Sequence, residues 1–161
     1  MTRRTRSGEN GVSAETHHWP PEVTAHMVVA GWSPGRRVDV SGWEEELRQN
    51  SGFRMHDAAG RFLAEFGGLK VPAGPNRPGQ QVASDEFELD PLQGEKMRPY
   101  FQRVGRAAAG ELYPLGSVAG GHAVLAIDEA ETVFMLFGDH CRRIGVGREA
   151  IANLILGRRP R

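Results

Sequence analysis

The sequence predicts one α+β domain, in which N-terminal helices pack on a mainly antiparallel sheet and a last helix follows the sheet. Two observations indicate this fold class. Apolar residues recur at helical spacing up to about residue 66, and they alternate as in strands beyond residue 112. The chain has 161 residues, of which 39% are hydrophobic. This is enough to fill one core without disulfides or a structural metal.

Three helices are predicted in the first half of the chain. The first begins at Pro21, because proline suits the first turn of a helix. The second begins after a cap at Asp39 or Ser41 and ends near Gly52. The third runs from about residue 55 to 66, before two glycines. Their apolar faces are Val23, Met27, Val28 and Ala30, then Val40, Trp43 and Leu47, then Ala59, Phe62, Leu63 and Phe66.

The middle of the chain predicts short strands and one more helix. Residues 69–71 and the alternation through Phe87 and Leu89 indicate two strands, separated by a loop rich in proline and glycine. A fourth helix is predicted from about Pro99 to Gly110.

The last third predicts a sheet and a final helix. A strand starts at residues 112–115, and two stronger strands at 122–127 and 132–137 are joined by a hairpin loop. Apolar residues at helical spacing predict a helix over 147–156. We expect the three tryptophans to pack in the core, because two lie on or beside amphipathic helices: Trp19, Trp32 and Trp43.

Composition divides the chain into a domain and two tails. Residues 1–18 are polar and rich in arginine, and we expect a flexible tail there. Residues 19–157 form the predicted domain, and residues 158–161 form a short basic tail. A single cysteine, Cys141, and the lack of an apolar stretch after Met1 predict a cytoplasmic protein. The lack of any long apolar run predicts no membrane association.

Charge is balanced over the whole chain but not along it. The 20 basic and 20 acidic side chains argue against a nucleic-acid binder, which normally has a basic excess. Between Gly31 and Gly157, however, 14 basic residues face 17 acidic ones. Two stretches without any cation, residues 84–95 and 107–141, hold ten of these carboxylates. They either solvate an outer face or present a negative surface to a positive partner.

No arrangement of residues predicts catalysis or a cofactor. His122, Asp128, Asp139, His140 and Cys141 are near one another in the sequence, but their spacing fits no usual metal-ligand pattern. The acidic surroundings of Cys141 disfavour a reactive thiolate. The glycines form no phosphate-binding motif. We therefore expect no enzyme, no metal and no cofactor.

Several short motifs, in this order, resemble the SUKH superfamily, especially its third subgroup. In the first half they are Ala30-Gly31-Trp32-Ser33-Pro34-Gly35-Arg36, Gly52-Phe53, Phe62-Leu63 and Phe66-Gly67-Gly68-Leu69. In the second half they are Leu112-Tyr113-Pro114-Leu115-Gly116, Ala126-Ile127-Asp128-Glu129, Phe134, Ile144-Gly145 and Leu156-Gly157. The sequence departs from the pattern at Ala130, where a turn glycine is common, and in its arginine-rich start.

The resemblance implies a non-catalytic immunity protein that binds and neutralises a cognate bacterial toxin, often a nuclease. A carboxylate-rich face would suit the cationic surface that a nuclease needs to hold phosphates. The predicted toxin-binding residues are therefore Asp85, Glu86, Glu88, Asp90, Asp128, Glu129 and Glu131. Two alternatives stay open: a regulatory protein-interaction adaptor, and a small metal-dependent hydrolase using His122, Asp139 and His140.

Overall fold

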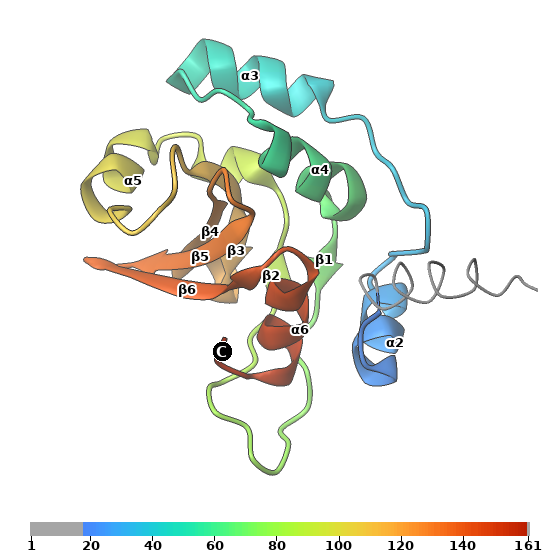
Figure 1. Ribbon diagram of the computed structural model, residues 1–161. Coiled ribbons are helices and arrows are strands. Elements are labelled where there is room, and N and C mark those ends of the chain that lie inside the picture. Colours follow the sequence, from blue (N-terminus) through green and yellow to red (C-terminus); the bar gives the residue numbers. More distant parts are fainter. Residues whose placement is uncertain (1–17, 161) are drawn as a thin grey trace, which may run out of the picture.

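One antiparallel sheet of six strands forms the centre of the molecule, and its strand order follows the chain (Figure 1). The computed structural model describes residues 18–160, so Arg161 and all but the last residue of the predicted tail over residues 1–18 lie outside the described residues. The strands are β1 Lys70–Val71, β2 Phe87–Glu88, β3 Tyr113–Val118, β4 Ala123–Ile127, β5 Thr132–Phe137 and β6 His140–Val146. Each strand pairs only with its neighbours along the chain, as in a meander.

Helices surround this sheet, which confirms the predicted α+β class. They are α2 Pro21–Val29, α3 Ser41–Ser51, α4 Asp57–Phe66, α5 Arg98–Val104 and α6 Arg148–Leu156, with short 3₁₀ turns η1 Pro91–Gly94 and η2 Ala119–Gly121. Figure 1 shows α3 and α4 at one end of the sheet and α2 beside α6. The helix α6 packs on β6 and on α2. None of the helices in residues 18–160 is long and apolar enough to cross a membrane.

The helix boundaries follow local chemistry that the sequence revealed. The predicted cap of α3 at Asp39 or Ser41 needs correction, because Val40 is the N-cap residue and no side chain caps the helix. Asp39 instead accepts a hydrogen bond from the backbone N–H of Ser41 (2.9 Å), the first residue of α3. Gly52 takes the left-handed conformation (φ 77°) that ends α3, as predicted. At α4 the N-terminal cap is His56, whose Nδ1 accepts from the N–H of Ala59. The three helices of the first half are therefore confirmed, although Val28 on α2 is 51% exposed and does not belong to the core.

The tryptophans pack in the core, as predicted. Trp19 and Trp32 are buried with ring centroids 5.1 Å apart, and Trp43 is partly buried. The guanidinium of Arg148 lies 4.6 Å from the Trp19 ring centroid and pairs with Glu65. These contacts join the start of α6 to α4 and to the segment before α2.

Two predictions in the second half need correction. The helix α5 ends at Val104, not near Gly110, because the chain turns at Gly105 and the N–H of Ala109 donates to Asp128. The strand β6 was not predicted at all. Its register shifts between Val133 and Phe134 of β5, so that Ile144 is an extra residue and the apolar alternation is broken.

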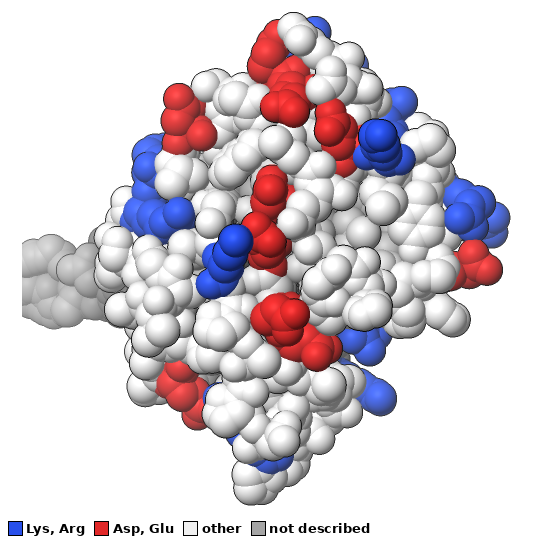
Figure 2. Space-filling view, turned by 180° about the vertical axis from the view of Figure 1, so that it is seen from behind, with Lys and Arg blue, Asp and Glu red and all other residues white. Residues whose placement is uncertain are grey.

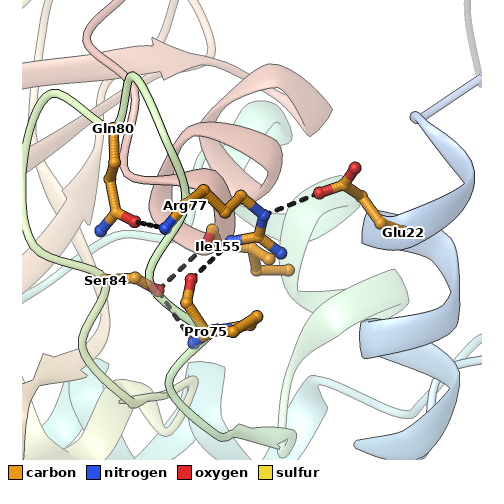
Figure 3. Close-up of polar contacts among 7 residues, drawn as sticks. Glu22, Pro75, Arg77, Gln80, Ser84 and Ile155 are labelled. Carbon is orange, nitrogen blue, oxygen red and sulfur yellow. Dashed lines mark hydrogen bonds and ion pairs between the residues drawn. The ribbon is translucent and has the colours of Figure 1, made fainter.

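The loop between β1 and β2 is fastened onto the C-terminal end of α6 (Figure 3). Ser84 donates to the carbonyl of Ile155 (3.0 Å) and accepts from the N–H of Gly74 (2.9 Å). Arg77 donates to the same carbonyl and pairs with Glu22 of α2 (2.8 Å). These bonds use a carbonyl at the end of α6 that has no partner within the helix. The loop is thereby held in a defined position.

Candidate protein-binding surface

The strand β2 turns a row of carboxylates outward. Phe87 and Leu89 are 2% and 0% exposed, so they point into the core. Because side chains alternate along an extended chain, Glu86, Glu88 and Asp90 point the other way. The alternation of apolar and acidic residues in the sequence therefore places the apolar side chains in the core and the carboxylates on the opposite side of the strand.

Five carboxylates from this one stretch of the chain make up what we call the acidic ridge: Asp85, Glu86, Glu88, Asp90 and Glu95. Asn50 at the end of α3 donates to Glu95 (2.6 Å), which places the far end of the ridge beside that helix. Figure 2 shows acidic side chains gathered in a column down the middle of one face, with few basic side chains among them. Glu86, Glu88 and Asp90, on the side of β2 opposite the core, therefore form a negative surface.

The carboxylates of the ridge differ in whether they have hydrogen-bond or ion-pair partners. Asp85 and Glu86 are exposed and make no side-chain hydrogen bond or ion pair with the described residues. Glu88 accepts from Gln93 (3.1 Å) and lies 4.0 Å from the ammonium of Lys70. That ion pair is exposed and therefore weak. Asp90 caps η1 by accepting from the N–H of Leu92. Asp85 and Glu86 are the carboxylates most available to a partner.

A small groove of about 310 Å³ runs beside the ridge. Glu86 and Glu88 border it, and Lys70 and Ser117 supply its other polar groups. Its remaining lining is Val71, Pro72, Phe87 and Gly120. An apolar groove bordered by the unpaired carboxylate of Glu86 can hold an apolar side chain of a partner whose neighbouring residues are basic.

Gly116 of β3 allows β2 to lie where it does. A Cβ atom at this position would lie 1.9 Å from the carbonyl oxygen of Glu88, a backbone atom that cannot rotate away. Only glycine permits this close approach. The position of the ridge on the sheet therefore depends on a residue outside the ridge.

The hairpin between β4 and β5 uses Asp128 structurally, which corrects the expectation that this carboxylate faces a partner. Asp128 is 2% exposed. It accepts from the backbone N–H groups of Ala109 (2.8 Å), Ala130 (2.9 Å) and Thr132 (3.0 Å). These bonds close the turn and attach it to the chain after α5. The signal was present in the sequence, because aspartate at the start of a turn commonly bonds the N–H two residues on.

Glu129 and Glu131 remain at the surface but are engaged. Glu129 accepts from the backbone N–H of Glu111 (2.9 Å). Glu131 pairs with Arg61 of α4 (2.6 Å), and this carboxylate raises the pKa of the arginine. Glu131 also carries the positive φ of the turn (69°), so the turn needs no glycine at Ala130.

The seven predicted residues consequently lie at two separate places. Asp128 follows Ile127, which pairs with Tyr113 at one end of β3. Glu86 precedes Phe87, which pairs with Val118 at the other end. At about 3.3 Å per residue along β3, the two groups are about 20 Å apart. The structure brings Asp85, Glu86, Glu88 and Asp90 together and leaves Asp128, Glu129 and Glu131 elsewhere. Sequence reasoning also missed Lys70, which reaches the ridge only through the pairing of β1 with β2.

The described residues contain no cluster of three or more histidine, cysteine, aspartate or glutamate side chains able to hold a metal ion. Asp139 pairs instead with Arg103 of α5 (2.9 Å). Burial raises the pKa of the Cys141 thiol, and the charge of Asp128 adds to this shift. Both causes disfavour a thiolate nucleophile at this position.

Fold and surface together define an α+β domain with a charged face beside an apolar groove. The model of the SUKH-3 immunity protein family matches residues 19–157. The chain therefore belongs to the SUKH-3 immunity protein family. No curated protein and no solved structure matches it. Membership suggests a role in toxin immunity, and immunity proteins are generally non-catalytic.

Proposed function

We propose that this protein is a bacterial, cytoplasmic immunity protein that binds a cognate toxin domain and blocks its active surface. The family carries the general part of this proposal. The observation that carries the particular part is the pair of exposed, unpaired carboxylates Asp85 and Glu86, of which Glu86 borders an apolar groove.

The acidic ridge favours a cationic partner, and a nuclease is the toxin class whose active surface must be cationic. An enzyme that cleaves nucleic acid neutralises phosphates with lysine and arginine. A protein with complementary charge is attracted to such a surface over a distance, and this attraction raises the association rate. The ridge would then occupy the surface that otherwise holds the substrate.

The role is tested by co-expressing the protein with the toxin encoded by the neighbouring gene and scoring host survival. We expect survival with the wild-type protein. The ridge is tested separately, by measuring the affinity of the purified pair in a series of salt concentrations for the double variant Asp85→Lys and Glu86→Lys. Reversing two exposed charges at an interface is expected to weaken binding about tenfold or more, mainly through slower association.

A matched control changes the net charge by the same amount at exposed positions outside the ridge, Glu46→Lys with Glu111→Lys. We expect the control to weaken binding by less than about twofold. Equal losses for both variants, or none for the ridge variant, would refute the electrostatic role of the ridge while leaving immunity intact. Binding without any survival would refute immunity and favour the adaptor.

A further inference from the structure

Four arginines surround a second groove, and Val82 and Ala83, which also line it, precede the acidic ridge in the chain. This arginine groove has a volume of about 270 Å³ and is formed by β6, the end of α6 and the segment that follows it. Arg142, Arg143, Arg158 and Arg159 line it, and no aspartate or glutamate is among its lining residues in the described part of the chain. The groove is therefore strongly cationic in a domain whose acidic residues outnumber its basic ones.

The floor of the arginine groove is apolar. Met135 of β5, Ile144 of β6 and Leu154 of α6 contribute to it. Among residues 18–160, no aromatic side chain lines the groove. Proteins that bind single-stranded nucleic acid combine basic residues with aromatic rings on which the bases stack. The arginine groove lacks the second component, so its chemistry fits an acidic peptide better than a nucleic acid.

The walls are held in place before any ligand arrives. The backbone N–H groups of Gln81 and Val82 both donate to the carbonyl of Gly157, at 2.9 and 3.0 Å. Figure 3 shows the neighbouring contacts that tie Ser84 and Arg77 to Ile155. On the same side, the N–H of Arg159 donates to Gln81 (2.7 Å). A preformed groove loses little conformational entropy when it binds, which favours affinity.

The arginine side chains suit carboxylates. The guanidinium is planar and presents a fork of N–H donors that can hold a carboxylate through two parallel hydrogen bonds. Arg142 is positioned by the Phe137 ring, whose centroid lies 5.8 Å from its guanidinium carbon, and by a 3.5 Å contact with the Met135 sulfur. Arg158 and Arg159 are exposed at the rim.

We propose that the arginine groove binds an extended acidic segment of a partner protein, with carboxylates on Arg142, Arg158 and Arg159 and an apolar side chain on the floor. This site has the opposite charge to the acidic ridge and shares no residue with it. The proposal does not depend on the toxin or on the ridge.

Fluorescence anisotropy with a labelled peptide in which glutamate alternates with leucine tests the proposal on the full chain. Replacing both rim arginines, Arg158→Glu with Arg159→Glu, is expected to weaken binding about tenfold or more, since each lost ion pair becomes a repulsion. The lysine variant, Arg158→Lys with Arg159→Lys, should keep part of the affinity because it keeps the charge but not the fork. Exposed arginines elsewhere supply the control, Arg37→Glu with Arg54→Glu, with an expected loss below about twofold.

Three further probes separate the alternatives. A peptide with serine in place of leucine should bind more weakly, because it leaves the apolar floor unfilled. A peptide with lysine in place of glutamate should not bind. Tighter binding of an oligothymidylate than of the acidic peptide would overturn the proposal in favour of nucleic acid. Equal losses of affinity in the rim variant and its control would also overturn the proposal. Self-association of the wild-type protein, detected by sedimentation and abolished in the rim variant, would overturn it too, because the acidic segment would then belong to a second copy.

Discussion

Asp128 is expected to hold the β4–β5 hairpin together, and its removal should cost more stability than that of any exposed carboxylate. Its Oδ1 accepts from the N–H groups of Ala130 and Thr132, and its Oδ2 accepts from the N–H of Ala109. A hydrogen bond to a charged group contributes about 1.5–3 kcal/mol to stability. The sum of three such bonds is an upper limit on the stability lost when Asp128 is replaced. The N–H groups of Ala109 and Ala130 belong to exposed residues and can bond to water after the substitution.

Two substitutions give a graded test. In Asp128→Asn the side-chain oxygen can keep the two bonds within the turn, but an NH₂ group then faces the N–H of Ala109. We therefore expect Asp128→Asn to lower the free energy of unfolding by about 2 kcal/mol, because it loses one charged hydrogen bond. Asp128→Ala should lower it by about 4 kcal/mol, because it breaks all three bonds. These losses are a large fraction of the total stability of a typical domain, about 5–15 kcal/mol.

Urea denaturation followed by circular dichroism measures both losses, provided that the dependence of the unfolding free energy on urea stays constant. The control is Asp139→Ala, because this carboxylate is exposed and its ion pair with Arg103 is worth less than about 1 kcal/mol. If asparagine and alanine destabilise equally, the division of the bonds between the two oxygens is wrong. If neither destabilises more than the Asp139 control, the structural role of Asp128 is wrong.

Two further predictions concern β3. The Tyr113 hydroxyl is buried without a hydrogen-bond partner in the described structure, so Tyr113→Phe should leave the free energy of unfolding in urea unchanged or raise it by up to about 1 kcal/mol. Burial also raises the pKa of Tyr113. The unfolded chain therefore loses this proton first, and stability should fall as pH rises above about 10, less steeply in the phenylalanine variant. Gly116→Ala should lower the unfolding free energy by about 3 kcal/mol or more, because its Cβ would overlap the Glu88 carbonyl; a thermal unfolding midpoint within a degree of wild type would contradict this.

Much of the fold could be predicted from the sequence because its local signals agree with the final structure. The glycine after α3 and the two strands around residues 128–131 are determined by near neighbours. The strand β6 could not be predicted, because the bulge at Ile144 exists only against β5. The end of α5 was misplaced for a similar reason, since the chain after Gly105 is held by Asp128 from a later strand.

The candidate surface, too, could be predicted from the sequence only in part. Alternation of apolar and acidic residues through β2 was sufficient to place Glu86, Glu88 and Asp90 on the outer side of the sheet. The cation-free stretches, however, did not predict which carboxylates stay unpaired. Arg61, Lys70 and Arg103 reach Glu131, Glu88 and Asp139 across the fold, from segments 18 to 70 residues away in the sequence.

The sequence by itself determined the class of fold, the family and the alternation that turns one row of carboxylates outward. Only the tertiary structure decided that Asp128 is buried, that Asp85 and Glu86 remain free and that four arginines meet around a groove. The physical reason is the distance along the sequence between the residues that determine each feature. Helix periodicity, capping and strand alternation depend on residues a few positions apart, whereas burial and ion pairing depend on which distant segments the core brings together.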